Sequence, residues 1–254
     1  MDFQTLNQPA YAEASAESAN QLIDKSLNQK KNMSMPKYVD LSHTLAHGMN
    51  TYQGVPAPVI RDFLSREESK KNYEEGTEFH IGILEIASNT GTSIDVPFHR
   101  YADGSDLSEM ALGILTGVEG ILIEAPASNH IAIDETFFRD LDLQGKAVLI
   151  YTGWDIYWRT DQYFQNHPFL TDSAAKLLVE KKAKLVGIDT FNIDDTRTRI
   201  RPVQSTLLLA GIPIVEHLCN LSLLPANGFR FYCVPPKIKG LGSFPVRAFA
   251  EIAG

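Results

Sequence analysis

Short apolar runs, separated by segments with helical patterning, constrain the fold of this chain more than any other feature. Each run is five or six residues long, which suits a buried strand. The runs are Gly120–Glu124, Lys146–Tyr151, Lys184–Asp189 and Ile212–Glu216. Further strands are predicted over Tyr38–Ser42, Glu78–Ser88, Arg230–Val234 and Phe244–Ile252. Strands interspersed with helices predict a single domain of the mixed α/β class.

Two helices are predicted between these strands. Thr171 is a good N-cap, because its hydroxyl can accept a hydrogen bond from an amide of the first turn, and the helix should reach about Lys182. The second helix covers Gln204–Ala210 and ends at Gly211, a favoured C-terminal stop. Asp134 is predicted to cap a short helix.

The chain divides into a short extension and one domain. Residues 1–35 are rich in Ala, Ser, Asn, Gln and Lys and poor in apolar side chains. This extension is expected to be either mobile or partly helical. The domain is expected over residues 36–254, because no internal repeat or low-complexity linker interrupts it.

Composition excludes several classes of partner. The chain has 254 residues, of which 44% are hydrophobic and 21% charged, as in ordinary globular proteins. Its net charge of −8, without a basic stripe, argues against nucleic acid. No apolar run approaches the roughly 20 residues of a membrane helix, and no secretion signal begins the chain. Cys219 and Cys233 are too few for a disulfide framework, so a cytoplasmic location is expected.

The segment Asn89–His99 is the strongest candidate for a functional site. It bends at Gly91 and stiffens at Pro97. Its polar side chains are Asn89, Ser93, Asp95 and His99. These groups either cap the backbone amides of a buried turn or form a site, and the pattern alone leaves both readings open.

Other candidates stand further along the chain. Glu216 ends a predicted buried strand, where a carboxylate faces a cleft or forms a structural ion pair. Gln204, twelve residues earlier, either points into the same cleft or bonds to amides of its own helix. The acids of the loop Asp189–Asp195 are predicted to be solvated or engaged in turns. An aromatic cluster begins at Trp154 and either packs in the core or lines a pocket.

The segment Asn89–His99 resembles the signature H-x-G-T-H-x-D-x-P-x-H of the cyclase family, whose members include bacterial kynurenine formamidases. The similarity extends over about residues 37 to 252, through Asp40–His43, Thr152–Trp154 and Pro235–Arg247. This resemblance implies a swivelling β/β/α fold with a mixed sheet in a single domain. It also implies assembly as a homodimer or homotetramer.

The resemblance also implies a metal centre built from histidines, an aspartate and a glutamate. Asp95, His99 and Glu216 match the family pattern, whereas Asn89, Ser93 and Gln204 stand at histidine positions. Asp95 and Glu216 are then the only strong candidate metal ligands. Because zinc favours nitrogen and sulfur donors, a site of oxygen donors is expected to hold Mn²⁺, Mg²⁺ or Ca²⁺ in preference to Zn²⁺, or no metal.

The activity implied by the resemblance is hydrolysis of a small amide, formamide or lactone, with His99 as proton shuttle and Asp95 and Glu216 as its catalytic partners. Candidates for packing on the substrate are Tyr52, Phe98 and Trp154. In a metal-free version, Asn89, Ser93 and Gln204 would donate hydrogen bonds to a developing oxyanion. Two alternatives remain: a metal-independent cyclase or lyase, and a catalytically silent homologue that binds a small molecule or a partner protein.

Overall fold

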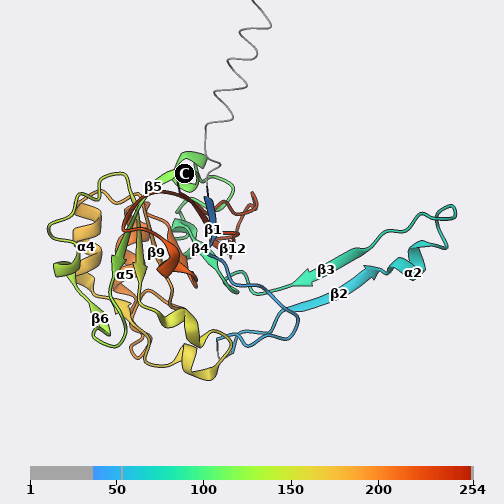
Figure 1. Cartoon of the computed structure of the whole chain (residues 1–254), viewed down its shortest axis with the longest axis horizontal. Coiled ribbons are helices and arrows are strands. Elements are labelled where there is room, and N and C mark those ends of the chain that lie inside the picture. Colours follow the sequence, from blue (N-terminus) through green and yellow to red (C-terminus); the bar gives the residue numbers. More distant parts are fainter. Residues whose placement is uncertain (1–36, 53, 253–254) are drawn as a thin grey trace, which may run out of the picture. The chain divides into compact units, whose positions relative to one another are not determined.

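The computed structural model describes residues 37–52 and 54–252, so the predicted extension over residues 1–35 lies outside the described residues. A nine-stranded sheet forms the centre of the described part, in the order β1-β13-β11-β5-β7-β9-β10-β4-β12 (Figure 1). Its strands are β1 (Lys37–Asp40), β4 (Ser93–Asp95), β5 (Val118–Glu124), β7 (Ala147–Tyr151), β9 (Leu185–Ile188), β10 (Ile214–Glu216), β11 (Asn227–Tyr232), β12 (Ser243–Pro245) and β13 (Phe249–Ile252).

The sheet is mixed, as predicted. The neighbours β5, β7, β9 and β10 run parallel, and they correspond to the four apolar runs of the sequence. The flanking pairs β11–β5, β11–β13, β10–β4 and β4–β12 are antiparallel. The strand predicted over Arg230–Val234 is β11, which ends at Tyr232 because the next amide, that of Cys233, donates to Leu115 O outside the sheet.

Two helices, α4 (Asp172–Glu180) and α5 (Pro202–Leu209), pack against one face of the sheet (Figure 1). Both were predicted. The Thr171 hydroxyl accepts a hydrogen bond from Ala174 N at 3.2 Å, and Gly211 after α5 has a φ of +73°. Pro at the first position of α5 starts that helix two residues before the predicted Gln204.

Side-chain alternation along the strands decides which groups face the helices. In β7, Val148 and Ile150 belong to the core beneath α4 and α5, whereas Leu149 belongs to the core on the opposite face. In β10, Ile214 faces the helices and Val215 faces away. The next residue, Glu216, is therefore directed to the helix side.

The remaining elements are short. β2 (Val59–Leu64) and β3 (Ile81–Glu85) form an antiparallel hairpin, and β6 (Ala132–Ile133) pairs with β8 (Phe169–Leu170). The other helices are α2 (Arg66–Ser69), α3 (Leu112–Leu115) and the 3-10 turns η1 (Pro97–His99), η2 (Glu135–Phe137), η3 (Trp154–Tyr157), η4 (Asp161–Phe164) and η5 (Leu221–Leu223). Asp134 caps η2, as predicted. No helix within residues 37–52 and 54–252 has the length and apolar character needed to cross a membrane.

Gly242 permits a close approach between the chain before β12 and the turn that carries His99. A Cβ added at Gly242 would lie 2.2 Å from His99 N and 2.4 Å from His99 Cα. We therefore expect Gly242→Ala to displace η1 and to lower the free energy of unfolding by about 1–3 kcal/mol, measured by urea denaturation. Gly113→Ala is the control, because Gly113 lies in α3 with no atom near its added Cβ. An unchanged stability of Gly242→Ala would contradict this reading.

Candidate functional site

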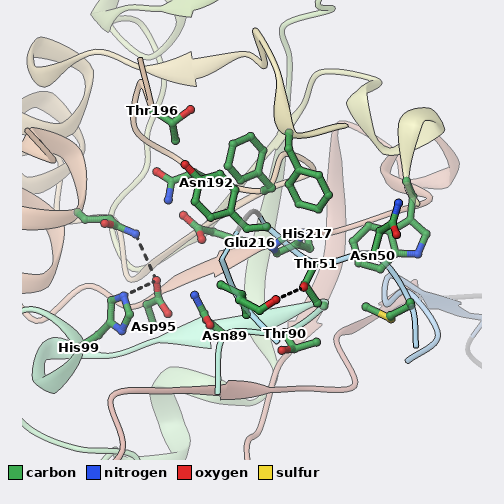
Figure 2. A pocket seen from close by; sticks show the side chains of 18 of the residues that line it. Asn50, Thr51, Asn89, Thr90, Asp95, His99, Asn192, Thr196, Glu216 and His217 are labelled. Carbon is green, nitrogen blue, oxygen red and sulfur yellow. Dashed lines mark hydrogen bonds and ion pairs between the residues drawn. The ribbon is translucent and has the colours of Figure 1, made fainter. Parts of the chain in front are cut away.

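A cavity of about 240 Å³ lies where β4, β10 and the first turn of α5 meet (Figure 2). It brings together six of the nine side chains that the sequence nominates. These are Tyr52, Asn89, Asp95, His99, Gln204 and Glu216. Residues from both halves of the chain thus converge on one cavity.

The two acids lie on neighbouring antiparallel strands. Glu216 in β10 is directly opposite Ser93 in β4, and Asp95 is opposite Ile214. Because residues two apart on a strand share a face, Asp95 and Glu216 are diagonal neighbours on the helix side of the sheet. Both side chains are buried. The register therefore holds two carboxyl groups close together out of water.

Burial raises the pKa of both acids. Burial is the main cause for Glu216, whose pKa lies well above its ordinary value, and the charge of Asp95 raises it further. A hydrogen bond from Ile193 N to Glu216 Oε1, at 2.8 Å, opposes this shift. Burial also raises the pKa of Asp95, against the opposing charge of His99. The pair consequently holds a proton more readily than two solvated carboxylates would.

His99 stands at the end of η1, a turn that begins with Pro97 directly after β4. Its Nε2 lies 3.7 Å from Asp95 Oδ2 (Figure 2). The side chain is 33% exposed, so the ring has access both to the buried acids and to solvent. A group placed in this way can exchange protons between a bound substrate and water.

Gln204 reaches the acids from α5. Its Nε2 donates a long hydrogen bond of 3.4 Å to Asp95 Oδ2, and it lies close enough to Glu216 to lower the pKa of that acid. Asp194 holds the start of α5 by accepting hydrogen bonds from Val203 N at 2.8 Å and Gln204 N at 2.9 Å. From the sequence, Asp194 was predicted to be solvated or engaged in a turn. Instead it is buried and caps the helix that presents Gln204.

One oxygen of Asp95 has no partner. Asp95 Oδ1 is buried without a hydrogen bond within the described residues, as is the hydroxyl of Ser243, which stands opposite Asp95 on β12. Ser243 lies near enough to lower the pKa of Asp95 but not in hydrogen-bonding geometry. A buried, unpartnered oxygen is costly, and a site that binds a ligand or a proton explains it.

Three nominated residues do not line the cavity. Ser93 is buried, opposite Glu216 in the pairing of β4 with β10. Phe98 lies in η1 beside His99, where the tight turn directs successive side chains apart. Trp154 is buried, with its Nε1 donating to Tyr163 O at 2.9 Å. Trp154 thus packs in the core, whereas Trp158 of the same predicted aromatic cluster lines the cavity.

Apart from Tyr52, the aromatic part of the wall comes from residues that the sequence did not nominate as substrate contacts. Tyr52 stacks on Phe191, with ring centroids 5.4 Å apart, and Phe164 meets Phe191 edge to face at 5.3 Å. Trp158 and His217 complete this side of the cavity. Trp158 belonged to the predicted aromatic cluster and His217 directly follows Glu216, but neither position showed which way the ring would point.

His217 is a neutral imidazole held in an uncommon backbone conformation. Burial lowers its pKa to about 3, with smaller contributions from His43 and His167. Its φ of +58° lies in the left-handed region, which costs a non-glycine residue on the order of 1 kcal/mol. Its ring nitrogen Nδ1 lies 3.1 Å from the hydroxyl of Tyr163.

The donors present do not fit the histidine-rich metal centre that the family resemblance implies. Within residues 37–52 and 54–252, no group of three or more His, Cys, Asp and Glu side chains is placed to hold a metal ion. Among the described residues, Asp95 and Glu216 are the only carboxylates on the cavity wall, and Gln204 directs an amide N–H toward one of them. Zinc sites are built mainly from histidine and cysteine donors, which this pair of carboxylates does not supply.

The chain matches the family model described as "Putative cyclase" over residues 39–195, and it belongs to that family. It is 26% identical to the kynurenine formamidase of Geobacillus thermodenitrificans over 216 residues, which cover 84% of this chain and 97% of that enzyme. It is 24% identical to the kynurenine formamidase of Bacillus cereus over 217 residues, 85% of this chain and 98% of that enzyme.

Solved structures share the fold. Isatin hydrolase A from Ralstonia solanacearum superposes with a TM-score of 0.73 at 20% identity, covering 98% of this chain and all of that one. A structure described as a potential metal-dependent hydrolase with cyclase activity gives a TM-score of 0.69 at 24% identity, covering 85% of this chain and 98% of that one. The swivelling α/β fold with a mixed sheet predicted from the sequence is thereby confirmed.

We expect the protein purified without chelator to carry no stoichiometric zinc after dialysis, as measured by elemental mass spectrometry. The variant Asn89→His/Gln204→His should retain zinc under the same conditions, because it adds two imidazole donors to Asp95 and Glu216. Adding Glu216→Ala to that variant removes one ligand and should weaken the retention. A full complement of zinc in the wild-type protein would show that the oxygen donors suffice.

Proposed function

We propose that this protein is a hydrolase that cleaves the C–N bond of a small amide or formamide, or the ester bond of a lactone, with an aromatic or cyclic body. The observation that carries the proposal is the convergence of Asp95, Glu216 and His99 on one cavity with an aromatic wall. The similarity to kynurenine formamidases supports the same class of reaction. Cytoplasmic action is part of the proposal, in keeping with the free, buried thiols of Cys219 and Cys233.

The proposed reaction follows from the proton positions. His99 removes a proton from a water molecule as that water attacks the substrate carbonyl carbon. The C–N bond then breaks, and His99 returns the proton to the departing nitrogen. Asp95, 3.7 Å from His99 Nε2, stabilises the imidazolium formed between these two steps.

The developing negative charge on the carbonyl oxygen needs donors. Gln204 and Asn89 line the cavity and carry N–H groups, and Glu216 in its protonated form carries an O–H. Such donors are each worth roughly 3–4 kcal/mol in a site that excludes water. Ser93, which was expected to join them, is buried outside the cavity lining and takes no part in this proposal.

Whether a divalent cation binds to Asp95 and Glu216 is a separate question for experiment. The oxygen donors of Asp95 and Glu216 would accept Mg²⁺, Ca²⁺ or Mn²⁺ more readily than Zn²⁺. The proton transfers proposed here require no cation. The replacement of three imidazoles also favours one alternative, a silent homologue that binds small molecules without turnover, and the following experiment separates it from the hydrolase.

We expect wild-type protein to hydrolyse at least one member of a panel of N-formylkynurenine, aryl formamides and aryl lactones, with turnover that persists in chelator. His99→Ala should lower kcat by about 10²–10⁴-fold, because it removes the proton carrier. His130→Ala is the control, since His130 is exposed and does not line the cavity. Turnover abolished by chelator would restore a cation to the mechanism. No turnover of any compound would favour the silent homologue.

We also propose that the protein is a homodimer or homotetramer in which the β2–β3 hairpin packs on a second copy. Ile60 and Leu84 are opposite one another in this hairpin and are 45% and 50% exposed, an apolar pair that would be covered by a partner. We expect light scattering after gel filtration to give at least twice the chain mass, and Ile60→Ser/Leu84→Ser to lower it. Glu85→Ser, on the other face, is the control. A monomeric wild-type protein would refute this.

A further inference from the structure

A second imidazole lies in the cavity wall and has no part in the proposed proton transfers. His217 follows β10, is buried, and has a φ of +58°. Its backbone N–H donates to Thr190 O at 2.9 Å, and its carbonyl accepts from the Thr92 hydroxyl at 2.6 Å. These bonds hold the chain in a conformation that non-glycine residues rarely adopt, with the ring in the cavity wall between Glu216 and Thr51 (Figure 2).

Tyr163 determines which nitrogen of His217 carries the hydrogen. The Tyr163 hydroxyl lies 3.2 Å from the backbone oxygen of Asp189 and 3.1 Å from His217 Nδ1. The hydroxyl has one hydrogen to donate, and the Asp189 carbonyl can only accept. Because that carbonyl is buried and makes no other hydrogen bond within the described residues, the hydroxyl donates to it. The contact with His217 is then satisfied only if Nδ1–H donates to the phenol oxygen.

The remaining nitrogen, His217 Nε2, is therefore a hydrogen-bond acceptor. It makes no hydrogen bond to any described residue, and it is not among the buried atoms left without a partner. It is consequently open to the cavity that His217 lines. The ring also meets Trp158 edge to face at 5.6 Å, so the acceptor is set in an aromatic wall.

We propose that His217 Nε2 accepts a hydrogen bond from an N–H group on an aromatic ligand that packs against Trp158. An acceptor fixed by Tyr163 and otherwise unpaired favours ligands that bring a donor and disfavours ligands of the same shape that lack one. If the protein has the proposed hydrolase activity, His217 selects aromatic amides and amines over N-substituted or oxygen analogues.

The tautomer is tested directly by long-range ¹H–¹⁵N correlation spectra of the histidine rings. The signals of His217 are assigned by their loss in His217→Asn, a replacement that tolerates the left-handed backbone. We expect Nδ1 to be protonated and Nε2 to be bare in the wild-type protein. Tyr163→Phe, which keeps the ring and removes the hydroxyl, should lose this preference. A wild-type ring protonated on Nε2 overturns the proposal.

Ligand selection is tested with indole and benzofuran, which share one shape and differ in the N–H donor. Neither has an amide or ester bond to hydrolyse. We expect wild-type protein to bind indole about 10-fold more tightly by calorimetry, and His217→Asn to bind both within about 2-fold. A tenfold difference in affinity is about 1.4 kcal/mol, which is within the range of one hydrogen bond. Equal wild-type affinities, no binding of either compound, or a preference that persists in His217→Asn overturns the proposal.

The two proposals fail separately. Indole selectivity that depends on His217, without turnover of any amide, leaves the binding role standing and removes the hydrolase. Turnover of aryl formamides, with equal affinity for indole and benzofuran, leaves the hydrolase standing and removes the role of His217. Tyr163→Phe gives a second variant if His217→Asn fails to fold, because the loss of one hydroxyl leaves the aromatic packing of residue 163 in place.

Discussion

Two carboxyl groups, those of Asp95 and Glu216, are buried as neighbours on antiparallel strands, and the rest of the site is arranged around them. Removing charged groups from water costs several kcal/mol each, and like charges add to that cost. The protein offsets part of it with the Ile193 amide and with Gln204. An arrangement this unfavourable for stability is typical of functional sites, where acids with shifted pKa values serve in catalysis or binding.

Further buried polar groups lie at the carboxyl ends of the parallel strands. Thr152 follows β7, Asp189 follows β9, and His217 follows β10. Buried Asp189 accepts hydrogen bonds from Thr152 N at 2.9 Å and Gly153 N at 2.8 Å, which tie the first two strand ends together. Clefts at this edge are where open α/β sheets bind ligands. The parallel centre of the sheet thus explains why the cavity lies at this edge.

The strands and helices could be predicted because they depend on local patterns. Four apolar runs became β5, β7, β9 and β10, and Thr171 capped its helix. The polar residues of the cavity wall could be nominated from the family resemblance. Two other nominated residues, Ser93 and Trp154, do not line the cavity. The direction of a side chain depends on register and on partners distant in sequence, such as the carbonyl of Tyr163 for Trp154. Phe191 and His217 were missed for the same reason.

The residue at position 204 determines what kind of centre the two acids can form. A metal cation supplies two positive charges to a pair of carboxylates, whereas the amide of Gln204 supplies only a dipole and one long hydrogen bond of 3.4 Å. A dipole leaves the repulsion between Asp95 and Glu216 largely uncompensated. Burial strengthens this repulsion, because the interior of the protein screens charges less than water does. The pair relieves this repulsion by keeping a proton, in line with the raised pKa of both acids. The two acids can therefore hold a proton beside His99, in a place where a histidine-rich site would hold a metal ion.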